Sequence, residues 1–287
     1  MSDQAAELRK RIDELRSIKQ AKTIAIISGK GGVGKSNFAL NFSLALSQKG
    51  KSVLIFDLDI GMGNIDILLG VSAKYSIVHL FDEHLSIEDI IEQGPHNLSY
   101  IAAGSGLVDI FSMDEEKFQY FLGEFKKLIN SYDYILFDMG AGVTEGSMYF
   151  MLAADECFVV TTPEPTSLTD AYAIIKHITQ KNKDMNIRLL VNRALNHKNG
   201  LNTMNRLQHV IKRFLNVQVN PLGILPDDRT VSEAVVSQVP FLLFDQKSSV
   251  ARAITQIADQ YTGQDINIEK KVPSFFLSKL RKFIKER

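Results

Sequence analysis

Near its amino terminus the chain reads Ile24-Ala25-Ile26-Ile27-Ser28-Gly29-Lys30-Gly31-Gly32-Val33-Gly34-Lys35-Ser36, and a helix-forming stretch follows. An apolar strand, a glycine-rich loop and a helix in this order are the context of a phosphate-binding P-loop. The glycines allow backbone N–H groups to approach phosphate oxygens without a Cβ in the way. A helix that begins near Ser36 adds the positive end of its dipole. The stretch therefore predicts a nucleotide site.

Two side chains of this loop have defined roles in such a site. Lys35 is expected to place its cation on the β- and γ-phosphates, and the Ser36 hydroxyl is expected to bind Mg²⁺. A chance glycine-rich loop is the alternative, and it is disfavoured because loop, Lys-Ser pair, strand and helix occur together. The loop residues expected to bind the nucleotide are Gly29, Gly31, Gly32, Val33, Gly34, Lys35, Ser36 and Asn37.

Apolar runs and helical stretches alternate over most of the chain. The runs typical of buried strands are 23–28, 53–57, 98–102, 134–138, 157–162, 188–192 and 221–225. The stretches with helical periodicity are 37–48, 115–129, 167–179 and 201–214. Near-continuous apolar strands separated by helices indicate a mostly parallel sheet with helices on both faces. We therefore predict an α/β fold with one doubly wound domain over residues 22–261.

Carboxylates follow two of the predicted strands. Asp57 ends the run 53–57, Asp59 lies two residues beyond it, and Asp138 ends the run 134–138. Ligands of open α/β sheets bind beyond the carboxyl ends of the strands, so acids placed there are expected to hold a metal ion or to orient water. A helix cap or a turn is the alternative role for each acid.

Lys30 stands directly after the first glycine of the loop, where an ordinary P-loop needs no lysine. Residues 30–36 resemble the deviant Walker A motif of the MinD/ParA class of P-loop ATPases. The resemblance implies that Lys30 reaches the phosphates of the facing protomer in a homodimer that forms with ATP. A second cation would then complete charge neutralisation only when two subunits meet. A solvated loop lysine is the alternative.

The same resemblance assigns catalytic and metal roles. It implies that Lys30, Lys35 and Asp59 are catalytic, and Asp59 matches the switch I aspartate that positions the attacking water. Asp138 matches the Walker B acid that holds Mg²⁺, and Asp57 assists it, so the implied metal-binding residues are Ser36, Asp57 and Asp138.

The adenine contacts are also implied by the class. Asn192 is expected to recognise the base with Arg193 beside it, and Pro226 lies in the loop expected to cover the base. No guanine-binding Asn-Lys-x-Asp motif occurs in an equivalent place, which favours ATP over GTP. The implied cofactors are therefore ATP or ADP with Mg²⁺.

Four stretches favour one branch of the class. Residues 53–66 and 162–172 resemble the flagellar MinD relatives called FlhG, YlxH or FleN, and so does Asp138-Met139-Gly140-Ala141-Gly142. The segment Asp3–Arg9 resembles the Asp-Gln-Ala-x-x-Leu-Arg motif that docks on the GTPase FlhF. The resemblance implies a switch that controls flagellum number and placement, stimulates FlhF and assists assembly of flagellar switch (C-ring) proteins. MinD-type placement of the division site is the alternative.

The amino-terminal segment, residues 1–21, is predicted to be a partner-binding helix. Ala5, Leu8, Ile12 and Leu15 give it a narrow apolar face, too short for a lasting coiled coil. Such a short helix is marginal alone in water, so it either packs on its own domain or folds on a partner.

The carboxyl-terminal end is predicted to contain a linker, residues 262–272, and an amphipathic helix, residues 273–287. Phe276, Leu280, Phe283 and Ile284 share one face, and most basic residues lie elsewhere. Large apolar anchors with a basic face are typical of an interfacial helix on anionic lipid. We therefore expect a cytoplasmic protein that attaches reversibly to the inner face of the cell membrane. The alternative is a last helix docked on the core.

Composition limits the other function classes. Lys+Arg and Asp+Glu are both 33 in 287 residues, so net charge gives no reason to expect nucleic acid as a partner. This argues against a DNA-binding ParA-like protein, and the intact P-loop argues against a nucleotide-independent scaffold. The single cysteine, Cys157, lies in an apolar run and is compatible with a reducing cytosol. No apolar run is long enough to span a membrane.

Overall fold

The computed structural model describes residues 20–59, 63–83, 85–104, 115–140, 142, 145–266 and 276–285. The predicted partner-binding helix therefore lies outside the described residues, except for its last two positions. The same holds for residues 267–272 of the predicted linker and for both ends of the predicted tail helix.

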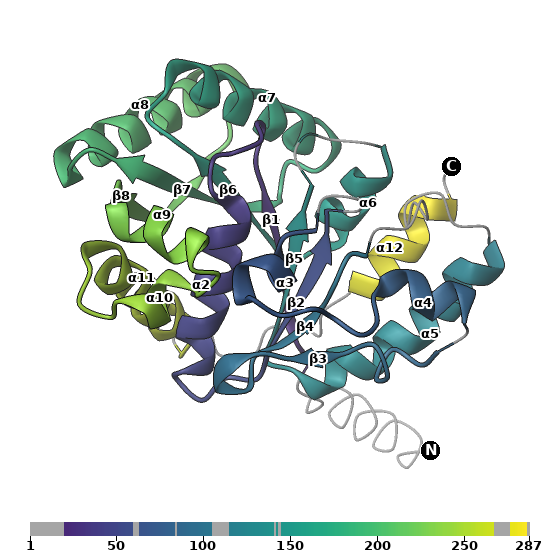
Figure 1. The fold of residues 1–287 in the computed structure, drawn as a ribbon. Coiled ribbons are helices and arrows are strands. Elements are labelled where there is room, and N and C mark those ends of the chain that lie inside the picture. The colour runs from purple at the N-terminus through teal and green to yellow at the C-terminus, as the bar shows by residue number, and fades with distance from the viewer. Residues whose placement is uncertain are drawn as a thin grey trace, which may run out of the picture.

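Eight strands of the described residues form one sheet in the order β3-β4-β2-β5-β1-β6-β7-β8 (Figure 1). All neighbouring strands are parallel except the short pair β3 and β4. The predicted doubly wound, mostly parallel sheet is therefore confirmed. The strands are β1 Lys22–Ile27, β2 Val53–Leu58, β3 Glu92–Gln93, β4 Ser99–Ile101, β5 Tyr134–Met139, β6 Glu156–Thr161, β7 Asn186–Ala194 and β8 Asn220–Pro226.

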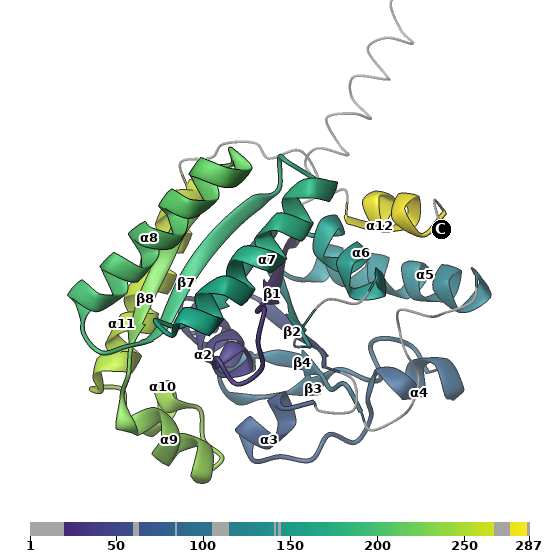
Figure 2. The same ribbon diagram turned by 90° about the horizontal axis from the view of Figure 1, so that it is seen from above.

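Helices cover both faces of this sheet (Figure 2). One face carries α2 Lys35–Ser47, α3 Ile65–Leu69, α9 Arg229–Val236, α10 Phe241–Phe244 and α11 Ser249–Ile266. The other carries α4 Ile77–Asp82, α5 Glu115–Ser131, α6 Glu145–Ala153, α7 Pro165–Lys181, α8 His197–Leu215 and α12 Phe276–Lys285. The central strands β2, β5 and β6 are buried along their whole length, as expected for strands with a hydrophobic core on each side.

The structure has one strand that the sequence did not predict and one helix that is longer than predicted. The antiparallel strand β3 was not predicted, because two residues are too few to give a strand pattern. Helix α11 continues to Ile266, so the first five positions of the predicted linker are helical instead. The Thr262 hydroxyl donates to the Ala258 carbonyl within this last part of the helix, which accommodates a polar residue there.

Helix α12 docks on the protein core, which is the arrangement that the sequence left as the alternative. Phe276 and Leu280 are both fully buried. The Phe276 ring lies 5.1 Å from the Phe137 ring of β5 and 5.0 Å from the Phe125 ring of α5, measured between centroids. Two of the anchors predicted to face lipid, Phe276 and Leu280, therefore face the hydrophobic core. Within the described ranges, no helix is both long and apolar enough to cross a bilayer.

Candidate nucleotide site

The P-loop joins β1 to α2 at the carboxyl edge of the sheet. Gly34 caps the helix in the left-handed region, with φ at 88°, and a Cβ at this position would lie 2.4 Å from the Asn192 side-chain nitrogen. Position 34 therefore requires glycine, because the backbone is left-handed there and because Asn192 leaves no room for a Cβ. Asn192 donates to the Val33 carbonyl at 2.8 Å, so the end of β7 fixes the shape of the loop.

Lys35 lies in the first turn of α2 and is buried. Its ammonium donates to Asp138 Oδ1 at 2.6 Å, and Ser36 Oγ lies 3.5 Å from the same nitrogen. Asp138 follows Phe137 near the end of β5 and has no exposed surface. The structure thus brings together the P-loop lysine, the adjacent hydroxyl and the predicted Walker B acid.

Asp57 lies beside Asp138, because the two are register partners in the neighbouring strands β2 and β5. Burial of Asp57 and the nearby Asp138 charge raise the pKa of Asp57 to about 7. Backbone N–H groups of Asp59, Ile65 and Asn64 donate to the Asp57 carboxylate and oppose this rise. Two adjacent buried carboxylates therefore share a space that favours an additional cation.

The same two acids fit the predicted Mg²⁺. Asp138 Oδ2 is buried and has no hydrogen-bond partner among the described residues. An unsatisfied carboxylate oxygen beside a second carboxylate and the Ser36 hydroxyl is a set of hard oxygen donors, which Mg²⁺ prefers. Ser36, Asp57 and Asp138 would hold the ion, directly or through water. Among the described residues, no group of three or more His, Cys, Asp or Glu side chains is placed to hold a metal ion by itself.

Asp59 lies just beyond the end of β2. Its backbone N–H donates to Asp57 Oδ1 at 3.0 Å, and its carboxylate lies against Gly140, where a Cβ would be 3.1 Å away. Partial burial raises the pKa of Asp59, the Lys35 charge lowers it, and the Asp138 charge raises it. Asp59 is thus electrostatically coupled to the same cluster and contacts the loop that follows β5.

Lys30 does not join this cluster. Its side chain is 44% exposed, and its ammonium lies 3.1 Å from Glu164 Oε2 and 3.5 Å from Thr166 Oγ1 at the start of α7. The sequence prediction did not include Glu164 in the site. Residues 162–172 were singled out only for a resemblance, and nothing in the sequence indicated that they contact the loop.

The residues predicted to contact the base form a second group. A cavity of about 50 Å³ lies beside the P-loop. It is lined by Asn192, Arg193 and Pro226, which were predicted at the base, and by the loop residues Gly34 and Asn37. Arg193 is exposed and has a φ of 53°, and its backbone N–H donates to Asn192 Oδ1 at 2.9 Å. This cavity shares Asn37 and Arg193 with an open cleft of about 1150 Å³ that reaches Glu164.

Comparison with known proteins gives consistent results. A family model described as an AAA domain matches residues 21–191. The antiactivator FleN of Pseudomonas aeruginosa is 32% identical over 86% of this chain and 90% of its own. The flagellum site-determining protein YlxH of Helicobacter pylori is 32% identical over 99% of this chain and 100% of its own. The septum site-determining protein MinD of Pyrococcus horikoshii, solved as a complex with Mg-ADP, superposes with a TM-score of 0.71, with 26% identity over 87% of this chain and 99% of its own.

The fold and the site together define a P-loop ATPase with a deviant Walker A loop. The chain belongs to the MinD/ParA family and, within it, to the FlhG-like group that contains FleN and YlxH.

Proposed function

We propose that this protein is an ATP-dependent switch that dimerises, associates with membrane and controls the number or placement of flagella. The observation that carries the proposal is the position of Lys30. The cation of its own site is Lys35, which contacts Asp138, whereas Lys30 is held outside that site by Glu164. A lysine that is held outside its own site, by a glutamate that lines the open cleft, is available to the phosphates of a second copy.

Binding of ATP requires a rearrangement of the charges in the site. Lys35 must turn from Asp138 to the β- and γ-phosphates, which leaves the Asp138 charge, beside Asp57, without its cation. A Mg²⁺ bound with the nucleotide would supply that balance and would neutralise phosphate oxygens. Asp59, half-buried at the edge of the cluster, would then orient the attacking water. ATP is favoured over GTP by Asn192 and by the absence of a guanine motif from the sequence.

The surface around the cleft supports pairing of two copies. Leu195, Val235 and Val236 are large apolar side chains with 78%, 40% and 85% of their surface exposed, and all three line the open cleft. Contiguous exposed apolar side chains are typical of an interaction site. A second copy that covers them would bring its Lys30 toward the nucleotide and complete the sandwich.

The docked tail suggests how membrane attachment would be controlled. Phe276 stacks on Phe137, and the next residue of β5 is Asp138, which contacts Lys35. A nucleotide-driven shift of β5 or of the loop after it would loosen the contact that keeps α12 docked. Two released tails in one dimer would bind a vesicle with an avidity raised by about 100-fold or more over one tail.

The flagellar role follows from relatives and from sequence motifs. FleN and YlxH are each 32% identical to this chain, and the Helicobacter pylori MinD is 30% identical. This difference in sequence identity is too small to distinguish a flagellar role from a division-site role. The segment Asp3–Arg9 favours the flagellar role, in which it would stimulate an FlhF-type GTPase, and flagellar switch proteins would be further partners. Division-site placement remains the second candidate.

Replacement of Asp59 tests the switch. We expect Asp59→Ala to bind ATP without hydrolysis and to accumulate as a dimer that floats with anionic vesicles. Light scattering after size exclusion and vesicle flotation measure the two outcomes, and the double variant Asp59→Ala with Lys30→Ala is the control that should stay monomeric. A monomeric Asp59→Ala protein at saturating ATP would exclude the sandwich.

A partner assay separates the two candidate roles. Deletion of residues 2–20 should abolish stimulation of FlhF GTPase activity and leave ATP-dependent dimerisation intact. A pulldown with and without ATP should recover FlhF and flagellar switch proteins. Recovery of a division inhibitor alone would assign the protein to the septum-placing branch.

A further inference from the structure

A groove of about 450 Å³ follows the outer edge of strand β8, on the side of the molecule away from α12. No strand among the described residues lies beyond β8, and Figure 2 shows α8 and α11 on its two sides. Leu201 and Met204 of α8 form one wall, Ile257 of α11 forms part of the other, and Leu222 and Ile224 of β8 lie between them. The sheet edge is therefore recessed between two helices.

The groove is mainly apolar and partly open. Leu201 is 41% exposed, and Arg188 is the only charged residue among the described side chains that line the groove, with amides such as Gln256 and Gln260 at its rim. An apolar groove next to an open sheet edge exposes both hydrophobic surface and backbone groups, so proteins usually cover such a site. Its depth between two helices suits a single helix or strand better than a second folded domain.

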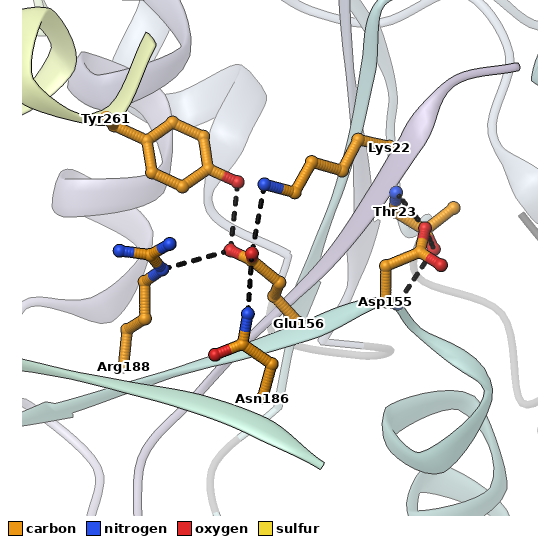
Figure 3. Close-up of polar contacts among 7 residues, drawn as sticks. All are labelled: Lys22, Thr23, Asp155, Glu156, Asn186, Arg188 and Tyr261. Carbon is orange, nitrogen blue, oxygen red and sulfur yellow. Dashed lines mark hydrogen bonds and ion pairs between the residues drawn. The ribbon is translucent and has the colours of Figure 1, made fainter. Parts of the chain in front are cut away.

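One end of the groove is formed by a buried ionic cluster (Figure 3). Glu156 accepts hydrogen bonds from Arg188 at 3.2 Å and from the Tyr261 hydroxyl at 3.0 Å, and both of these donors also line the groove. Glu156 also pairs with Lys22 at 2.9 Å, and the Lys22 ammonium lies 4.4 Å from the centre of the Tyr261 ring. Lys22 is the first residue of β1, so the chain before it joins the protein at this end of the groove.

The amino-terminal segment matches the groove in length and character. Its stripe, Ala5 to Leu15, covers eleven positions and would span roughly 16 Å as a helix. The seven residues of β8 extend over roughly 23 Å. Lys22 lies against Tyr261, which lines the groove, so a segment that immediately precedes it is covalently tethered at this end. Such a tether gives an effective concentration on the order of millimolar, which favours this segment over a free partner.

We propose that residues 2–16 fold back as a helix into the β8 groove, with the stripe of Ala5, Leu8, Ile12 and Leu15 against its apolar walls. The docked helix conceals part of the motif Asp3–Arg9. If the proposed function holds, a partner GTPase must therefore compete with the groove for this helix, and docking sets a threshold for partner binding.

Cross-linking within the full chain tests the proposal without nucleotide or partner. The only native cysteine, Cys157, is fully buried, and burial raises the pKa of its thiol to about 12, so it does not react. We expect a short bismaleimide to join Leu8→Cys to Gln256→Cys on the groove rim rapidly in a dilute monomer. The matched control, Leu8→Cys with Glu83→Cys at the end of α4, should react at least about tenfold more slowly, as expected when one pair is held together and the other is not.

A groove variant shows whether docking itself causes the cross-link. Leu201→Glu places a carboxylate at a half-exposed position in the apolar wall. It should reduce the rate of cross-linking between Leu8→Cys and Gln256→Cys about tenfold, whereas Leu201→Met should leave that rate unchanged. Equal rates for the groove pair and the control pair would overturn the proposal, and so would a rate unaffected by Leu201→Glu. Because the readout needs neither ATP nor FlhF, its failure is distinguishable from failure of the proposed function.

Discussion

Lys35 and Asp138 determine the charge balance of the candidate phosphate site. Asp138 is fully buried, and the Lys35 ammonium neutralises it from 2.6 Å. Under the proposed function the lysine has two roles, because it neutralises Asp138 in this structure and would bind phosphate when nucleotide enters. A buried pair of this kind makes the two roles separable by mutation.

Removal of the lysine alone should affect both roles. Lys35→Ala should abolish nucleotide binding and lower the free energy of unfolding of the nucleotide-free protein by about 3 kcal/mol, because it leaves a buried carboxylate without its cation. Urea denaturation and titration with a fluorescent ATP analogue measure the two effects. The double variant Lys35→Ala with Asp138→Asn should regain most of the stability but none of the binding. A single variant as stable as the wild type would contradict the account.

Asp228 gives a prediction about pH. Partial burial opposes its ionisation, but hydrogen bonds from Ser249, Thr230 and Val250 outweigh burial and lower the pKa of Asp228 to about 2. Because the pKa is lower in the folded protein, Asp228 stabilises the fold above the pKa of the unfolded chain, and this contribution is lost as pH falls toward 2. Asp228→Ala should therefore lower the free energy of unfolding by about 1–2 kcal/mol at neutral pH. The difference in this free energy between variant and wild type should shrink below about pH 4. Denaturation midpoints across this range measure it, and a difference independent of pH would refute it.

Local chemistry was predictable from the sequence, and distant pairings were not. A P-loop and a strand-end acid leave short, specific patterns, so the sequence singled out Lys35, Ser36 and Asp138, which the structure brings together. Glu164 was missed because it pairs with Lys30 from a position 134 residues away, and no local pattern encodes that contact. The raised pKa of Asp57 was equally unpredictable, since it depends on the register between β2 and β5.

At the scale of elements, the position of α12 has the largest consequence. Its Phe276 ring packs among Phe125, Phe137 and Phe150, with ring centroids within 6.2 Å. In this state the helix therefore contributes to the stability of the ATPase domain itself.

Truncation of the buried anchor tests this contribution. Phe276→Ala should lower the free energy of unfolding by about 3–5 kcal/mol, because the ring is fully buried and its removal leaves a cavity. Ser278→Ala, at an exposed position of the same helix, should change stability by less than about 0.5 kcal/mol and serves as the control. Chemical denaturation without nucleotide or lipid measures both. A neutral Phe276→Ala would show that the helix is undocked in solution.

The strands illustrate what an apolar pattern can and cannot determine. All seven predicted runs are strands, since a parallel sheet buried on both faces requires nearly continuous apolar residues. The location of α12 could not be predicted in the same way, because an amphipathic helix satisfies its apolar face equally well on lipid or on protein. The sequence therefore predicted which residues form the apolar face of α12 but not the surface that this face contacts.

At the scale of the whole molecule, the pair of Lys30 and Glu164 would set how readily two copies form the proposed dimer. The pair is exposed, with side chains 44% and 59% accessible, and such a pair is typically worth about 0.2–1 kcal/mol. Release of Lys30 from Glu164 must precede its binding to the facing protomer, so the pair opposes dimerisation by up to this amount.

Neutralisation of Glu164 should therefore favour the dimer. In an Asp59→Ala background, Glu164→Gln should lower the ATP concentration for half-maximal dimerisation by up to about fivefold. Light scattering over an ATP titration measures the shift, and Asp170→Asn, farther along α7, is the comparison variant. A higher ATP requirement would mean that Glu164 contributes to the dimer interface instead.

The stacking of Phe276 on Phe137, one residue before Asp138, has a thermodynamic consequence. If nucleotide weakens this stacking and raises lipid affinity, linkage requires lipid to raise nucleotide affinity by the same factor. The bilayer would then be the site where the protein is held and also an effector that raises its affinity for nucleotide. Nucleotide should dissociate more slowly from protein on a vesicle than from protein in solution, so that each membrane encounter prolongs the state that produced it.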